Sequence, residues 1–307
     1  MAARRPFAFT WRFATIEAPA KLDALHDACR AWLPDLVVHE SADLAAPIVA
    51  KALGLPRVHH AFGRLVPLAC WERAAAETQH LWTELGVPAE PLCGAFGGTY
   101  VDICPPSFQS EAVPAGTSVE PVRPLFPPPA GASAPAWLEA LPARPTVYVT
   151  LGTVRNDLTL FRVLLDGLAS LDANVVATIG PGHDPAALGP LPPNAIVEGY
   201  VPQAFLLSRA AVVVSHGGSG SILATLAEGL PALLVPQGAD QFDNAARCAE
   251  LGAGLVLMPG EVTADAVTDA VATLLREGSY RERAQALAAE IGALPHPRDV
   301  VPRLLER

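Results

Sequence analysis

The sequence has little positive charge and no long apolar run. Lysine and arginine number 21 against 31 aspartates and glutamates, a net charge of −10. A nucleic-acid-binding protein normally carries a basic surface, so nucleic acid is not the expected partner, although backbone dipoles can still hold a small anion. No apolar run reaches membrane-spanning length, and Pro6–Ala14 is too weakly apolar for the core of a signal peptide. We therefore expect a cytoplasmic protein without a membrane span.

Cysteine is scarce, whereas proline is abundant. The five cysteines are an odd number without a close pair at metal-ligand spacing, which favours reduced thiols over a disulfide framework. Five of the 31 prolines fall between Pro124 and Pro135, a density that excludes a helix interior or a central strand. We expect a linker at 124–142 between a first domain at 1–123 and a second at 143–294.

Apolar, strand-like runs alternate with helical patterns along most of the chain, which predicts an α/β protein with parallel sheets. In the second half we expect strands at Thr146–Thr150, Asn174–Ile179, Ala195–Glu198, Ala211–Ser215, Ala232–Val235 and Gly254–Leu257. In the first half we expect strands at Leu36–His39, Arg57–His60 and Tyr100–Cys104, and helices at Ala18–Leu33, Asp43–Leu53 and Leu65–Leu85. Six strands with interleaved helices indicate a doubly wound second domain, whereas the first half has only three or four strands.

A glycine-rich segment, Ser215-His-Gly-Gly-Ser-Gly-Ser221, joins a predicted strand to a predicted helix. Glycines at such a junction let backbone N–H groups approach an anion, and the helix N-terminus adds partial positive charge and unpaired donors. Ser219 and Ser221 can cap the helix or donate to a phosphate. A tight turn with a capping serine explains this segment about equally well when it is taken alone.

Other motifs follow neighbouring strands and so lie at the same sheet edge, where α/β folds bind ligands. Asp240 and Gln241 form a carboxylate–amide pair that suits sugar hydroxyls, because a carboxylate only accepts hydrogen bonds while an amide donates and accepts. Tyr200 offers a ring that can stack on a base. Thr150-Leu-Gly-Thr153 offers hydroxyls and a closely approachable backbone.

Together these motifs resemble those of family-one GT-B glycosyltransferases of the actinobacterial natural-product type. The shared order is Thr150-Leu-Gly-Thr153, Gly199-Tyr-Val-Pro-Gln203, His216-Gly-Gly-Ser-Gly-Ser221, Gly229-Leu-Pro231 and Asp240-Gln241 with Asn244. The resemblance covers nearly all of residues 146–307, and the combination is specific although each motif alone is weak. It implies a GT-B fold of two Rossmann-like doubly wound domains. It also implies an inverting transfer of a sugar from a UDP- or TDP-linked donor to a hydroxyl of a small lipophilic acceptor.

For the donor, the resemblance implies residues at the carboxyl edge of the second sheet: Thr153, Tyr200, Val201, Gln203, His216, Gly217, Gly218, Ser219, Gly220, Ser221, Asp240 and Gln241. The loop from His216 to Ser221 would hold the diphosphate, and Asp240 and Gln241 would bind the sugar hydroxyls. The resemblance implies no metal ion or other cofactor, because backbone donors and the helix dipole offset the diphosphate charge.

The remaining donor residues have individual implied roles. Tyr200 stands where many family members have tryptophan and would stack on the base, while Val201 would contact the base edge through its backbone. Gln203 would reach the ribose or phosphate region, and Thr153 would lie near the phosphates.

The first half resembles only the later part of the family's acceptor domain, through Trp32–Glu40 and Ala45–Pro56. Family members begin with a strand and a turn whose histidine is the general base, whereas the first histidine here, His26, falls in a predicted helix. We therefore expect an incomplete N-terminal domain that lacks roughly its first three strands. The segment 295–307 resembles the family's closing helix, which crosses back to the first domain.

Glu40 lies at or near the position of the carboxylate that orients the missing base, and it is the catalytic candidate. A partly buried carboxylate can have a raised pKa and accept a proton. The alternative is a catalytically impaired nucleotide-sugar-binding protein or a truncated fragment. A sugar-nucleotide epimerase on the same fold is less favoured.

Two further expectations concern the first half. A metal site at His39, His59 and His60 is disfavoured, because adjacent residues of one strand point to opposite faces. An uncovered sheet edge would favour self-association, so a homodimer is a candidate assembly.

Overall fold

The computed structural model describes residues 5–152 and 157–306 and divides into two compact units. Unit 1 contains the chain up to Arg123 together with the segment from Leu294 onward, and unit 2 contains Pro124–Ala293. Among the residues described, no helix combines the length and apolar character that a membrane crossing requires.

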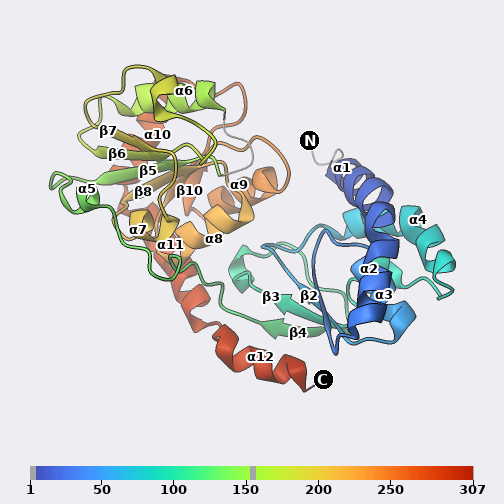
Figure 1. Ribbon diagram of the computed structural model, residues 1–307. Helices are drawn as coiled ribbons and strands as arrows, with labels where there is room; N and C mark the ends of the chain where they lie inside the picture. The colour runs from blue at the N-terminus through green and yellow to red at the C-terminus, as the bar shows by residue number, and fades with distance from the viewer. Residues whose placement is uncertain (1–4, 153–156, 307) are drawn as a thin grey trace. The chain divides into compact units, whose positions relative to one another are not determined.

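Unit 1 is built on a four-stranded sheet in the order β1-β2-β3-β4, with every neighbouring pair parallel (Figure 1). The strands are β1 (Val37–Glu40), β2 (Arg57–His60), β3 (Thr99–Asp102) and β4 (Ser118–Pro121). The helices are α1 (Arg5–Phe9), η2 (Thr10–Glu17), α2 (Ala18–Trp32), α3 (Ala46–Leu53), α4 (Leu68–Glu84), η3 (Pro91–Gly94), η4 (Pro106–Phe108) and α12 (Pro297–Leu305). The three strands predicted from the sequence are confirmed, and β4 is the fourth.

Helices pack against this sheet and against one another. Val300 of α12 packs with Val58 and Val101 on one face. A larger core between the helices centres on Trp71 and Trp82 of α4. The helical region begins at Arg5 rather than at Ala18, because the weakly apolar segment before Ala18 packs into this core, with the ring of Phe9 edge-on to Trp71 at 5.4 Å.

Unit 2 contains a six-stranded parallel sheet in the order β10-β9-β8-β5-β6-β7 (Figure 1). The strands are β5 (Thr146–Thr150), β6 (Asn174–Thr178), β7 (Ala195–Glu198), β8 (Val212–Ser215), β9 (Ala232–Leu234) and β10 (Gly254–Val256). The helices are α5 (Ala136–Glu139), α6 (Leu158–Leu168), η5 (Pro185–Leu188), α7 (Gln203–Leu207), α8 (Ser219–Ala227), α9 (Gln241–Glu250), α10 (Ala264–Arg276) and α11 (Gly278–Ala293). Each strand lies where the sequence predicts it, with ends that differ by at most one residue.

Helices cover both faces of this sheet, as a parallel sheet requires. Val147 and Val149 of β5 belong to the core formed with α6 and α10, whereas Tyr148 between them belongs to the core formed with α7 and α8. The alternation follows from the two-residue repeat of a strand. The segment expected as a linker begins unit 2, where Trp137 and Leu138 pack into the Tyr148 core.

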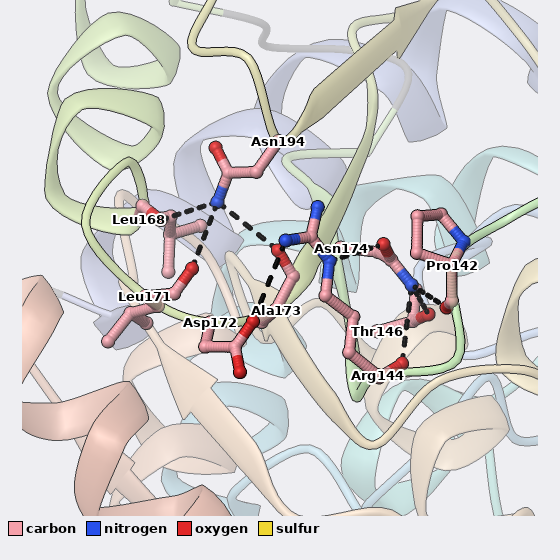
Figure 2. Close-up of polar contacts among 9 residues, drawn as sticks. All are labelled: Pro142, Arg144, Thr146, Leu168, Leu171, Asp172, Ala173, Asn174 and Asn194. Carbon is pink, nitrogen blue, oxygen red and sulfur yellow. Dashed lines mark hydrogen bonds and ion pairs between the residues drawn. The ribbon is translucent and has the colours of Figure 1, made fainter.

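Two asparagines fix the amino-terminal edge of the sheet (Figure 2). The Asn174 amide nitrogen donates to the carbonyls of Pro142 (2.9 Å) and Arg144 (3.2 Å), and its oxygen accepts from Arg144 Nε at 2.8 Å. The Asn194 amide nitrogen donates to three carbonyls of the α6–β6 connection, those of Leu168, Leu171 and Ala173. These bonds satisfy loop carbonyls at the edge opposite to the glycine-rich segment.

Candidate functional site

The centre of the unit 2 sheet has a topological switch between β5 and β8. The chain runs from β5 outward to β7 on one side and from β8 outward to β10 on the other. Doubly wound sheets bind ligands in the crevice at the carboxyl ends of such a strand pair. Thr150 and Ser215 are register partners at those ends, so the segments that follow them, Gly152 and the His216 loop, lie together.

The imidazole of His216 occupies the space between two glycines. A Cβ on Gly218 would lie 2.6 Å from His216 Nε2, and a Cβ on Gly152 would lie 2.9 Å from the same atom. Burial lowers the pKa of His216 below its ordinary value, although Asp240 opposes the shift, so the ring is mainly neutral near pH 7. Its Nδ1 is buried without a hydrogen-bond partner among the described residues.

The glycine-rich loop opens helix α8 as the sequence predicts. Gly217 adopts a φ of +79°, a left-handed conformation that glycine accepts without strain. Helix α8 begins at Ser219, and the first backbone bond within it runs from Ile222 N–H to the Gly218 carbonyl at 2.9 Å. The N–H groups before Ile222 therefore have no partner inside the helix and are available to other acceptors.

One of these donors is taken by a carboxylate from the next strand–helix junction. Ser219 donates to Asp240 Oδ2 from its backbone N–H at 3.0 Å and from its hydroxyl at 2.6 Å. Asn244 Nδ2 donates to the same oxygen at 2.9 Å. The structure thus brings Ser219 and Asp240 together, and among the residues described only Oδ1 of the carboxylate is left without a hydrogen bond.

Gln241 is also partly engaged. Its Oε1 accepts from the backbone N–H groups of Gln237 (2.8 Å) and Gly238 (3.0 Å), which shapes the loop before α9. The amide nitrogen of Gln241 makes no hydrogen bond within the described chain. The atoms of this pair that are left without a hydrogen bond among the described residues are therefore Asp240 Oδ1, an acceptor, and Gln241 Nε2, a donor.

The residues expected to bind the base lie after β7, at the far edge of the sheet from β8. Tyr200 is 57% exposed, so its ring is free to stack, whereas the side chain of Val201 is buried against Tyr148 and leaves only the backbone for a ligand. Gln203 begins α7, and its Nε2 is buried without a partner among the described residues. β7 and β8 are separated by three interstrand spacings, about 14 Å, which suits opposite ends of an extended ligand. Thr153 lies outside the described residues.

In unit 1, Glu40 ends β1 with a partly exposed side chain. Burial raises the pKa of its carboxyl, while a 2.7 Å hydrogen bond from Ala42 N–H to Oε2 opposes the shift and Asp43 adds to it. His60 is the register partner of Glu40 on β2 and is also exposed. The sequence does not predict this pairing, because strand register is set by the fold.

His39 and His59 are buried side by side. Their rings stack at 5.0 Å, and His59 contacts the Ser41 hydroxyl (2.8 Å) and the Ala95 carbonyl (3.1 Å). Burial lowers the pKa of His39 to about 4 and that of His59 to about 3, so both rings are neutral at physiological pH. Within residues 5–152 and 157–306 no three His, Cys, Asp or Glu side chains are grouped to hold a metal ion.

Family models match nearly the whole chain. Residues 8–152 match the N-terminal domain, and residues 162–307 the C-terminal domain, of the family described as erythromycin biosynthesis protein CIII-like. L-demethylnoviosyl transferase of Streptomyces niveus is 36% identical over 282 residues, which cover 90% of this chain and 72% of that protein. Tylactone mycaminosyltransferase of Streptomyces fradiae is 32% identical over 320 residues, with 95% and 69% covered.

Solved structures of glycosyltransferases also superpose on nearly the whole chain. Spinosyn rhamnosyltransferase SpnG superposes with a TM-score of 0.85 at 27% identity, over 98% of this chain and 81% of that one. The glycosyltransferase VinC, solved in complex with DTDP, superposes with a TM-score of 0.79 at 28% identity, over 98% of this chain and 78% of that one.

Proposed function

The chain belongs to the EryCIII-like family of GT-B glycosyltransferases, and on that premise we propose that it transfers a sugar from a nucleoside diphosphate to a hydroxyl of a small lipophilic natural product. Thymidine diphosphate is the nucleotide that we favour over UDP. VinC was solved with DTDP, SpnG was solved with thymidine diphosphate, and a relative from Streptomyces peucetius is named TDP-daunosamine transferase DnrS. The lipophilic acceptor is supported by relatives named for tylactone and erythronolide.

The opening of helix α8 is the observation that carries this proposal. The backbone N–H groups of Gly218, Gly220 and Ser221, the helix dipole and the neutral ring of His216 lie together at the sheet's switch point. Such an arrangement stabilises the negative charge that a diphosphate gains as it leaves the sugar. We propose that these groups replace a metal ion, so that transfer needs no divalent cation.

Glu40 is the proposed general base. Its raised carboxyl pKa makes it a better proton acceptor than an ordinary carboxylate. In this proposal the acceptor oxygen forms a bond to the anomeric carbon as its proton moves to Glu40. The bond from that carbon to the diphosphate breaks on the opposite side, and the electron pair leaves with the diphosphate. A single displacement of this kind inverts the anomeric configuration.

The test is an incubation of the purified chain with labelled TDP- and UDP-sugars and a panel of phenols and macrolide aglycones. We expect transfer that persists in excess EDTA, with the inverted anomer identified by its proton coupling constant. Glu40→Gln should lower the transfer rate and leave nucleotide affinity unchanged. If the chain binds the nucleotide but shows neither sugar transfer nor slow hydrolysis of the donor, it is instead a nucleotide-sugar-binding protein with impaired catalysis.

We also propose that the chain self-associates through unit 1. β1 is an edge strand, and Val38 at its middle is 61% exposed. Parallel sheets normally have both faces covered, and exposed edge strands pair readily with other chains.

A further inference from the structure

The side chain of Asn244 links three parts of the candidate donor site. It is 2% exposed and lies on α9, one turn after Asp240. Its Nδ2 donates to the Gly217 carbonyl at 3.0 Å and to Asp240 Oδ2 at 2.9 Å, with Ser219 Oγ at 3.3 Å. Two hydrogens on one nitrogen thus serve two acceptors that belong to different loops.

The hydrogen bond from Asn244 to the Gly217 carbonyl sets the direction of the Gly218 N–H, a hydrogen-bond donor for the diphosphate. All peptide bonds described are trans, so the C=O of Gly217 and the N–H of Gly218, which share one peptide plane, point in opposite directions. Because Asn244 holds that carbonyl toward α9, the Gly218 N–H points away from α9. A left-handed glycine at 217 allows other orientations, so the backbone alone does not fix this peptide.

The second hydrogen bond, from Asn244 to Asp240, prevents repulsion between the Gly217 carbonyl oxygen and the Asp240 carboxylate. Asn244 Nδ2 lies between a carbonyl oxygen and a carboxylate oxygen, and both can only accept hydrogen bonds. Without a donor between them these two oxygens repel, and the flexible partner, the peptide that follows Gly217, is free to rotate. Asp240 itself is still held by the backbone and hydroxyl of Ser219.

We propose that Asn244 is a positioning residue for the donor diphosphate: it fixes the peptide between Gly217 and Gly218 so that its N–H faces the leaving group. The inference rests on the proposed function of this loop. Asn244 touches no reacting atom, and its contribution is confined to the part of the affinity that depends on phosphate.

The test compares thymidine with thymidine diphosphate, and uridine with UDP, by isothermal titration of the full chain. Asn244→Ala removes the amide, and Asn244→Ser keeps one donor. For Ala we expect diphosphate affinity to fall about 10- to 100-fold with nucleoside affinity unchanged, and for Ser an intermediate loss. Glu250→Gln, at the exposed end of the same helix, is the matched control and should change neither affinity.

Equal losses for nucleoside and diphosphate in the variants would mean a purely structural role and overturn the inference. An unchanged diphosphate affinity in Asn244→Ala would overturn it too, while the proposed function would stand. A wild-type chain that binds neither diphosphate would overturn the proposed function first. Thermal unfolding of each variant establishes that the folded chain is being titrated.

Discussion

His216 is positioned by two residues that lack side chains. Gly152 and Gly218 leave the space that the imidazole fills, and burial in that space keeps the ring mainly neutral. A neutral ring can donate one hydrogen bond to a phosphate while its other nitrogen only accepts. The glycines at these two positions therefore make room for the His216 ring as well as for a ligand that approaches the backbone.

At this scale we predict the effect of Gly218→Ala. Gly218 has an ordinary φ of −62°, so the new methyl group acts through its contact with the His216 ring rather than through backbone strain. We expect TDP affinity to fall at least about tenfold, or 1.4 kcal/mol. His216→Ala, which deletes the ring, should cost about 1–3 kcal/mol of binding.

Gly182→Ala is the control, because a Cβ at Gly182 meets open space. Titration calorimetry with TDP measures all three variants. A Gly218→Ala chain that binds TDP as tightly as wild type would contradict the role given to the ring.

Residue-scale features were predictable where the signal is local in the chain. The His216–Ser221 loop and Asp240-Gln241 are contiguous motifs, and the structure places both at the carboxyl edge of the sheet. The contact between Asn244 and Gly217 joins residues 27 apart, and no local pattern reveals it. No local pattern predicts that Ser219 donates two hydrogen bonds to Asp240 Oδ2 either.

The elements β1 and β2 carry a buried row of ionisable rings. His39 and His59 are register partners that stack, and Tyr100 of β3 extends the same row with its ring edge-on to His59. Their burial means that protonation of either histidine would place a charge inside the core of unit 1.

This row predicts a loss of stability in mild acid. The folded pKa of His39, about 4, lies below its ordinary value of 6.5, so the unfolded chain binds more protons. The stabilisation that neutral His39 contributes to the folded state is intact above pH 6.5 and is lost as the pH falls toward 4. Between pH 7.5 and pH 5 we expect the unfolding free energy to drop by about 2 kcal/mol from His39 alone.

Urea unfolding of wild type and His39→Gln at both pH values tests this. The variant should lose about 2 kcal/mol less than wild type over the interval. The same loss in both chains would show that His39 does not titrate as a buried neutral ring.

Strand prediction succeeded where burial is continuous. The strands of unit 2 are covered on both faces, so they read as unbroken apolar runs and their ends are predictable within one residue. β4 escaped prediction because only Glu120 of its four residues is buried and Pro121 ends it. The helical start at Arg5 escaped it because that segment packs through long-range contacts such as that of Phe9 with Trp71.

The exposed edge strand of unit 1 predicts that the chain self-associates. Light scattering after size exclusion should show a dimer at micromolar concentration. Val38→Lys, which places a charge on the edge strand, should shift the chain toward monomer. Leu191→Lys, an exposed apolar position in unit 2, should not. A wild-type chain that is monomeric up to about 100 μM would rule out this assembly, because a dimer with a larger dissociation constant would scarcely form at lower concentrations.

In the proposed function a nucleoside diphosphate binds at the opening of helix α8. A titration of the ¹⁵N-labelled chain with TDP, followed by amide resonances in two-dimensional NMR, tests this binding. We expect the largest, saturable shifts at Gly218, Gly220 and Ser221, with a smaller concurrent shift at Tyr200. Thymidine should shift the Tyr200 resonance without shifting those of the glycine loop. Saturable shifts confined to residues outside the loop from His216 to Ser221 would contradict the assignment of the site.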